Sequence, residues 1–511
     1  MAIASNKQKK RVVVVGAGIG GLTAGALLAK RGYQVTIFDQ AIVPGGCAST
    51  FKRRGFTFDV GATQVAGLES GGIHHRVFAE LGIEPPTATY CDPACAVFLP
   101  GETKPINVWR DRVKWQEERQ RQFPRSEPFW NLLNRLFEAS WRFQGRDPVL
   151  PPRNAWDLWQ LVSAVRVDTL ITVPFTLMTV ADALKLYGLD RERRLKTFLD
   201  LQLKLYSQVG TEETALLYAA TALAVSQAPQ GLFHLEGSMQ VLSDRLVAGL
   251  QKYDGKLLMR HSVEQIHTES GKVTGVTVRN HQGKTWIEEA DEVVANVTAQ
   301  NLVQLTGDYP TGRLRDRALG NYQRRVEKLP QPSGAFVVYL GVKRDAIPAD
   351  CSPHLQFLYN QDEVIGENNS LFVSVSKPGD GRAPEGLATL IASSFTDVDL
   401  WWQDRQDYEQ IKQQYTDEAI ARLGSYFDLN AENIVYTEAA TPRTFANYTA
   451  RDKGIVGGLG QRISTFGPFG FANRTPIKHL WLVGDSTHPG EGTAGVSYSA
   501  LTVARQIEAA Q

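Results

Sequence analysis

Three glycines near the start of the chain have the spacing of a phosphate-binding turn. Gly16, Gly18 and Gly21 follow a run of four valines, which predicts a buried strand over Arg11–Val15, and they open a stretch of helical composition. In such a turn the first glycine permits the bend, the second lets a pyrophosphate approach the backbone, and the third lets helix and strand pack closely. Because the helix N-terminus would face the negative charge, the pattern predicts a dinucleotide site.

An acidic residue follows this turn at the distance that a ribose contact requires. A second strand is predicted over Tyr33–Asp39, and Asp39 ends it 18 residues after Gly21. A carboxylate at that place accepts hydrogen bonds from ribose hydroxyls. Strand, helix and strand together form the βαβ unit that would position these groups.

Three later blocks carry glycines or acids that suit the second half of a dinucleotide. Pro44–Thr50 and Gly55–Thr63 follow the second strand closely, and their glycines would let the backbone lie against a ligand. The third block, Trp481–Gly492, places Asp485 after a predicted strand and before a predicted helix. An acid there can accept from ribityl hydroxyls while the helix dipole faces a flavin ring.

The three blocks together resemble the flavin-binding amine-oxidase superfamily, and more closely its carotenoid desaturase and isomerase branch of phytoene-desaturase type. The stretches closest to the signatures of that branch are Phe51–Gly61 and Val483–Gly490. A further stretch, Gly490–Leu501, is most similar to cyanobacterial carotenoid 3',4'-desaturases. The resemblance spans essentially the whole chain.

The resemblance implies FAD as the cofactor and assigns residues to it by motif. The ADP half would be held by Gly16, Gly18, Gly21 and Asp39, and the adenine would be met by the backbone of Val263. The pyrophosphate and the flavin would be lined by Gly45, Gly46, Gly61, Ala62 and Thr63. The ribityl chain and the ring would be reached by Gly484, Asp485 and Val496. The chain departs from its relatives at Cys47, where they often carry Arg, and this removes one charged contact.

Pieces of dinucleotide-binding type recur at the beginning, middle and end of the chain, so we expect an α/β fold with a discontinuous first domain. This Rossmann-type FAD-binding domain, GR2 or amine-oxidase-like, would comprise residues 11–106, 237–300 and 441–511. Residues 107–236 and 301–440 would form an inserted α+β substrate domain. Its antiparallel sheet is predicted from three alternating or β-rich runs, Phe336–Val342, Leu371–Val375 and Ala388–Ser394.

Glu491 is the ionisable side chain best suited to act beside a flavin ring. A flavin can accept a hydride from an allylic carbon while the neighbouring carbon loses a proton, and Glu491 would take that proton if its pKa is raised. The alternative is a carboxylate that only caps backbone groups of the flavin loop; His488 suits a structural role better than a catalytic one. Phe466, Phe469 and Phe471 are expected to line an apolar tunnel near the flavin.

The segment from Trp156 to Tyr187 is strongly apolar, and two interpretations of it stay open. An element that dips into one leaflet would let a long hydrocarbon pass from lipid to the active site, with Arg166 and Lys185 reaching headgroups. The alternative is a buried helix pair of the second domain. The resemblance to carotenoid enzymes favours the first, and with it a polyene substrate and a peripheral place on the cytoplasmic side of a membrane.

Composition and charge argue against several other classes of protein. A formal net charge of +1 leaves no excess to hold nucleic acid. Four cysteines are too few for a disulfide framework in 511 residues, and no Cys/His spacing predicts a metal site. The N-terminus lacks the pattern of a signal peptide. The longest uncharged apolar stretch, Thr169–Ala181, has 13 residues, whereas a membrane span needs ~20.

A second dinucleotide fingerprint is not found. Gly379 and Gly381 are followed by Pro384 where a third glycine belongs, so this stretch predicts a surface turn between strands. The flavin would then pass its electrons to an external acceptor, such as a quinone or dioxygen.

The favoured interpretation is an FAD-dependent carotenoid desaturase that adds a 3',4' double bond by hydride transfer from substrate to flavin. Three alternatives stay open. They are a carotenoid cis-trans isomerase that uses reduced FAD, a more distant amine oxidase, and a non-enzymatic prenyl-protein escort that lacks flavin.

Overall fold

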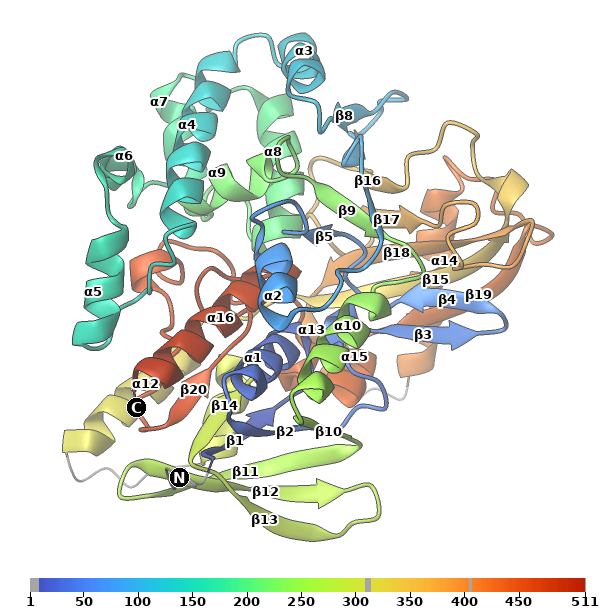
Figure 1. Cartoon of the computed structure of the whole chain (residues 1–511). Coiled ribbons are helices and arrows are strands. Elements are labelled where there is room, and N and C mark those ends of the chain that lie inside the picture. Colours follow the sequence, from blue (N-terminus) through green and yellow to red (C-terminus); the bar gives the residue numbers. More distant parts are fainter. Residues whose placement is uncertain (1–8, 308–313, 404–406, 511) are drawn as a thin grey trace.

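The computed structural model describes residues 9–307, 314–403 and 407–510 and confirms the predicted α/β fold class (Figure 1). Within these residues, a five-stranded parallel sheet has the order β10-β2-β1-β14-β20. Its strands come from the beginning, the middle and the end of the chain: β1 (Arg11–Val15), β2 (Gln34–Asp39), β10 (Lys256–Met259), β14 (Glu292–Ala295) and β20 (Leu480–Leu482).

The four valines of β1 alternate between the two faces of this sheet. Val12 and Val14 pack against a layer of helices formed by α1 (Ile19–Lys30), α2 (Ile73–Leu81), α10 (Gln240–Lys252) and α16 (Thr493–Ala509). Val13 and Val15 pack on the opposite face against β11 (His261–Glu269), β12 (Lys272–Asn280), α11 (Ala299–Thr306) and α12 (Leu314–Glu327). Because both faces are covered, the strand is a continuous apolar run instead of an alternating one.

A second, seven-stranded sheet has the order β19-β15-β18-β17-β16-β7-β8 in the part of the chain that is described, and it is antiparallel except where β16 meets β7. Val338 and Leu340 face α13 (Val398–Trp402) and α14 (Tyr408–Leu423), whereas Val337 and Tyr339 face the opposite side. The strands are β7 (Cys95–Phe98), β8 (Ile106–Val108), β15 (Gly334–Lys343), β16 (His354–Leu358), β17 (Ser370–Val375), β18 (Leu387–Thr396) and β19 (Ile434–Ala440).

β7 lies before residue 106, the predicted end of the first FAD-binding segment, yet it pairs with β16 in the seven-stranded sheet. The chain therefore first enters this second sheet at Cys95. The switch is not visible in the sequence because β7 is a short apolar strand of the same kind as those of the parallel sheet.

A layer of helices follows and lies at the top and the left of Figure 1. Aromatic and leucine side chains, including Trp115, Trp130 and Phe198, form its core. The stretch from Trp115 to Trp159, which is rich in aromatic residues, lies across three helices. The helices of the layer are α3 (Arg112–Gln122), α4 (Glu127–Gln144), α5 (Ala155–Ala164), α6 (Val167–Leu170), α7 (Val180–Leu186), α8 (Arg193–Ser207) and α9 (Leu216–Ala224).

Short strands and one buried ion pair connect the two sheets. The short strands are β3 (Thr50–Arg53), β4 (Phe56–Asp59), β5 (Val65–Ala66), β6 (Ala88–Tyr90) and β9 (Leu232–Leu235). A further strand, β13 (Thr285–Glu289), pairs with β12 and completes a separate three-stranded sheet with β11. Arg382 Nη2 lies 3.1 Å from Asp59 Oδ2, and both side chains are buried. The turn predicted at Gly379 and Gly381 does join β17 to β18, but its neighbour Arg382 points inward and ties the turn to β4.

Candidate functional site

A single cavity of about 1120 Å³ lies between the glycine turns of the parallel sheet and the seven-stranded sheet. With one exception, every residue assigned from the sequence to the cofactor or to catalysis lines it. These residues are Gly16, Gly18, Asp39, Gly45, Gly46, Gly61, Ala62, Thr63, Val263, Gly484, Asp485, Glu491 and Val496. The exception, Gly21, lies behind the wall.

The first glycine turn is fixed by contacts that leave no room for side chains. Gly16 has a φ of +98°, its N–H donates to the carbonyl of Phe38 at 2.8 Å, and a Cβ there would lie 2.7 Å from the carbonyl oxygen of Asn296. A Cβ on Gly21 would lie 2.0 Å from the carbonyl oxygen of Gly16. Gly21 therefore serves the packing of α1 on β1, as expected for the third glycine.

Asp39 lies at the end of β2 and braces the same turn. Its carboxylate accepts from the N–H of Ala17 at 2.6 Å and from the N–H of Ala41 at 2.7 Å. Burial raises the pKa of Asp39, although these two donors act in the opposite direction. The Asp39 carboxylate thus fixes the backbone of the turn, and the same carboxylate would accept hydrogen bonds from a ribose.

Two helices direct uncapped N-termini at this cavity. Gly18 is the N-cap residue of α1 and Gly492 is that of α16, and both glycines line the cavity. Among the described residues, neither helix has a side-chain cap or an acid in its first turn. Free N–H groups and the positive dipole ends of two neighbouring helices therefore face the cavity, and this favours an anionic ligand.

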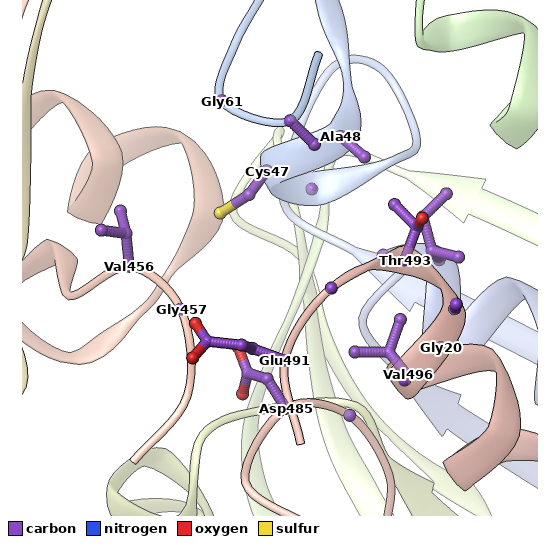
Figure 2. A pocket seen from close by; sticks show the side chains of 18 of the residues that line it. Gly20, Cys47, Ala48, Gly61, Val456, Gly457, Asp485, Glu491, Thr493 and Val496 are labelled. Atoms are coloured by element: carbon purple, nitrogen blue, oxygen red, sulfur yellow. The ribbon is translucent and has the colours of Figure 1, made fainter. Parts of the chain in front are cut away.

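The second glycine turn packs directly on the first. Gly45 has a φ of +120°, and its N–H donates to the carbonyl of Ala17 at 2.8 Å. Figure 2 shows Gly61 and Cys47 together at one edge of the pocket, with the Cys47 thiol pointing toward the segment that carries Val456 and Gly457. Burial raises the pKa of this thiol, so Cys47 faces the pocket as a neutral group.

Glu491 faces this pocket from the loop before α16 (Figure 2). Its Oε2 accepts from Gln208 Nε2 at 3.1 Å and from the N–H of Gly458 at 3.4 Å, while Oε1 has no partner within the described part of the chain. Burial raises the pKa of Glu491 to about 8, and the nearby Asp485 adds to the rise. The side chain can therefore exchange a proton near neutral pH.

Asp485 follows β20 and is paired with a cation that the sequence analysis missed. Arg451 Nη2 lies 2.8 Å from Asp485 Oδ2 and also donates to the carbonyl of Gly457 at 2.5 Å. Arg451 thus fixes both Asp485 and the backbone opposite Cys47. The arginine lies 34 residues before Asp485 in an irregular stretch, so neither spacing nor periodicity could reveal it.

Asn296 and Gln208 were also missed. Asn296 follows β14, its amide lies against Gly18, Gly20 and Gly21, and it lines the cavity beside Gly18 and Gly20. The sequence did carry a signal for Asn296, because it is a polar residue that directly follows a predicted buried strand. Gln208 ends α8 with a left-handed φ of +66°, and nothing in its sequence surroundings indicates that it reaches Glu491.

The cavity extends away from the glycine turns into a second part, which we call the apolar arm. It runs over the seven-stranded sheet and is lined by Leu201, Leu205, Tyr206, Tyr218, Ala222, Val225, Val337, Leu371, Phe372, Phe395 and Phe466. The expectation that three late phenylalanines share this wall is wrong for two of them. Phe471 is buried against Tyr322, and Phe469 is 44% exposed on the surface; a tight turn over Gly467–Phe469 separates both from Phe466.

The C-terminal end of α4 forms one part of the cavity wall and also contacts an apolar segment of the surface. Trp141, Arg142 and Gly145 line the cavity, and Arg142 Nε also donates to Asp168 of α6 at 2.9 Å. The surface segment, residues 158–187, exposes a set of large apolar side chains: Leu158, Trp159, Val162, Val165, Val167, Leu170, Ile171, Val173, Leu177, Leu186 and Tyr187. The interpretation of this segment as a buried helix pair is therefore wrong, because its large apolar side chains are exposed.

No helix of the described residues combines the length and the apolar character that crossing a membrane requires. Over the same residues, no three His, Cys, Asp or Glu side chains are grouped as a metal ion would need.

Comparison with known proteins agrees with this architecture. Residues 14–81 match the NAD(P)-binding Rossmann-like domain. The chain is 26% identical to a chloroplastic prolycopene isomerase from Daucus carota, over 97% of this chain and 80% of that protein. It is 27% identical to a zeta-carotene-forming phytoene desaturase from Myxococcus xanthus, over 99% of this chain and 95% of that one.

Solved structures share the fold over nearly the full length. A cyclohexylamine oxidase from Brevibacterium oxydans superimposes with a TM-score of 0.61 at 16% identity, covering 98% of this chain and 100% of that one. The fold is therefore that of the amine oxidases, and the full-length similarity to desaturases and isomerases makes the chain an enzyme of the oxidoreductase class.

Proposed function

We propose that the protein is an FAD-dependent carotenoid desaturase that introduces a 3',4' double bond. The observation that carries the proposal is the single cavity, which joins the glycine turns of a dinucleotide fold to an apolar arm. Similarity over the full chain to a phytoene desaturase supports a long polyene as the substrate class.

The residues around the glycine turns fit FAD. Two uncapped helix N-termini, at Gly18 and Gly492, suit the pyrophosphate and an electron-rich edge of the flavin ring. Asp39 would hold the adenosine ribose, the backbone of Val263 the adenine, and Asp485 the ribityl chain. The turns at Gly45, Gly46, Gly61, Ala62 and Thr63, together with Gly484 and Val496, would line the rest of the cofactor.

When bound, FAD supplies a two-electron acceptor for a hydride from an allylic carbon. Glu491 would take the proton that leaves the neighbouring carbon, because its raised pKa and unpartnered Oε1 suit proton exchange. The apolar side chains of the apolar arm would hold the polyene in place and exclude water. We infer that the electrons then pass to an external acceptor, a quinone or dioxygen.

The exposed apolar segment, residues 158–187, supports peripheral membrane association. An apolar surface of this extent on a protein with a polyene substrate favours insertion into one leaflet. Because α6 contacts the α4 end of the cavity through Asp168 and Arg142, the segment lies where a polyene would leave the lipid. We place this surface on the cytoplasmic side of a membrane.

Expression in a pigment-producing bacterium tests the proposal directly. Desaturation lowers the mass of the accumulating carotenoid by two hydrogens, whereas an unchanged mass with altered retention identifies a cis-trans isomerase. The similarity to a prolycopene isomerase makes isomerisation with reduced FAD the second candidate. Purified protein that lacks flavin absorbance near ~450 nm would contradict both and favour a non-enzymatic escort.

A further inference from the structure

A second hollow of about 660 Å³ lies on the surface beside the exposed apolar segment. It is lined by two apolar side chains that reach into solvent, Leu177 and Phe469, which are 66% and 44% exposed. Leu177 belongs to the exposed apolar segment, so the hollow borders directly on the surface that we place at the lipid. Its other walls are formed by residues 462–464, 468 and 470.

Three arginines converge on this hollow. Arg153 comes from the loop before α5, Arg325 from α12, and Arg462 from the loop that also carries Phe466 into the main cavity. Three segments distant in the sequence therefore bring guanidinium groups to one small depression. The one acid of its lining, Glu213, pairs with Arg462 Nε at 2.5 Å, so two positive charges stay in excess.

The charges of Arg153 and Arg325 are not neutralised within the described residues. Arg325 donates to the carbonyls of Gly470 at 3.1 Å and Ser464 at 3.2 Å and to that of Phe469, and it lies over the ring of Phe471. These contacts orient its guanidinium but bring no carboxylate. Burial lowers the pKa of Arg325, and the nearby charge of Arg153 lowers it further, so the two cations repel each other.

Guanidinium groups at the edge of an apolar surface match the chemistry of one kind of ligand. An anionic phospholipid offers a phosphate for the planar N–H donors and acyl chains for the apolar side chains next to them. A free anion would leave Leu177 and Phe469 in water. The combination of charge and apolar exposure in one hollow thus selects a lipid over a soluble phosphate.

We propose that this hollow binds the phosphate headgroup of an anionic phospholipid through Arg153 and Arg325. The proposal builds on the peripheral membrane association in the proposed function and adds a selectivity to it. A lipid bound there would lie close to the main cavity, because Arg462 lines the hollow and Phe466, four residues later in the same loop, lines the cavity.

The test is flotation of purified full-length protein with vesicles of phosphatidylcholine, alone or mixed with phosphatidylglycerol. Wild-type protein should bind the mixed vesicles more tightly, and Arg153→Gln should lower that affinity about fivefold while binding to phosphatidylcholine stays the same. Arg153 suits the variant because its side chain is exposed and forms no ion pair with a described carboxylate; its backbone N–H, which the substitution keeps, donates to Asp157 at 3.1 Å. Arg153→Lys should recover part of the loss, since the charge returns without the planar donors.

Arg245→Gln is the matched control. Arg245 is exposed on α10, outside both the hollow and the exposed apolar segment, so its loss should change binding to phosphatidylglycerol much less. An equal loss in both variants would show a diffuse electrostatic attraction and overturn the proposal, as would unchanged binding in Arg153→Gln. Suppression of the phosphatidylglycerol preference by excess inorganic phosphate would assign the hollow to a free anion instead.

A water-soluble lipid separates this proposal from the membrane association beneath it. Calorimetric titration with dihexanoyl phosphatidylglycerol below its micelle concentration requires no bilayer. Binding that weakens about fivefold in Arg153→Gln would support the hollow even if no vesicle is bound. No binding to this probe, together with flotation on phosphatidylcholine alone, would refute the hollow and leave the apolar contact intact.

Discussion

The walls around the glycine turns and the exposed apolar segment differ in how they are stabilised. Around the turns, backbone groups lie so close together that a Cβ on Gly16 would approach the Asn296 carbonyl to 2.7 Å. In the apolar segment, by contrast, Val167 and Leu170 are 86% and 55% exposed and pack against little. Substitutions in the first region should therefore act through folding and cofactor retention, whereas those in the second should act only through binding.

Gly21→Ala should give the largest effect. A Cβ at residue 21 would lie 2.0 Å from the Gly16 carbonyl oxygen, which is backbone and cannot rotate away. We expect the free energy of unfolding to fall by about 3 kcal/mol, measured by denaturant titration. Gly320→Ala in α12 is the control, because the nearest atom to its Cβ is 3.7 Å away and the helix should gain up to ~1 kcal/mol. Equal midpoints for the two variants would contradict the packing role of Gly21.

Asp485→Ala tests the part of the first region that is charged. The substitution leaves Arg451 as a mostly buried cation without its partner, at 18% exposure, and breaking such a pair costs about 3 kcal/mol. If this cost falls on the cofactor-bound state, flavin affinity should drop about a hundredfold. Glu491→Gln keeps the shape of its side chain and should retain flavin. Equal flavin content in the two purified proteins would refute the assignment of Asp485.

The same contrast explains how much of the molecule could be predicted. The first glycine turn, Asp39 and the βαβ unit that positions them follow from local rules of backbone geometry that act over a few residues. Arg451 and Gln208 could not be predicted, because each reaches the site from a loop or helix end through tertiary folding. The apolar segment was ambiguous for another reason: periodicity and composition are the same for a buried helix and for one that faces lipid.

Val167→Glu combined with Leu170→Glu tests the second region. Both side chains are exposed, so the melting temperature and the flavin content should stay the same. Affinity for phosphatidylcholine vesicles should fall about tenfold, because two apolar contacts with the bilayer are replaced by charges. Ile287→Glu on β13 is the matched control, since Ile287 is 63% exposed but lies on the β11–β13 sheet. Vesicle binding that is unaffected by the double substitution would exclude this surface from the membrane contact.

Gln208→Leu should produce the smallest effect, a displacement of the pH profile. Burial raises the pKa of Glu491 to about 8, so its carboxyl is neutral below that pH, and a rate that needs the carboxylate as base should rise with pH through about 8. The N–H of Gln208 donates to Oε2 and favours the charged form. Its removal should therefore raise the pKa of Glu491 further and move the rising limb up by about one pH unit.

The profile of Glu491→Gln provides the reference for this displacement. If Glu491 takes the substrate proton, this variant should lose the rising limb near pH 8 while it keeps its flavin. If Glu491 only caps the backbone of Gly458, all three proteins should show the same pH dependence of product formation. The position of the limb therefore distinguishes a proton acceptor from a structural carboxyl, even though both would lower the rate when they are removed.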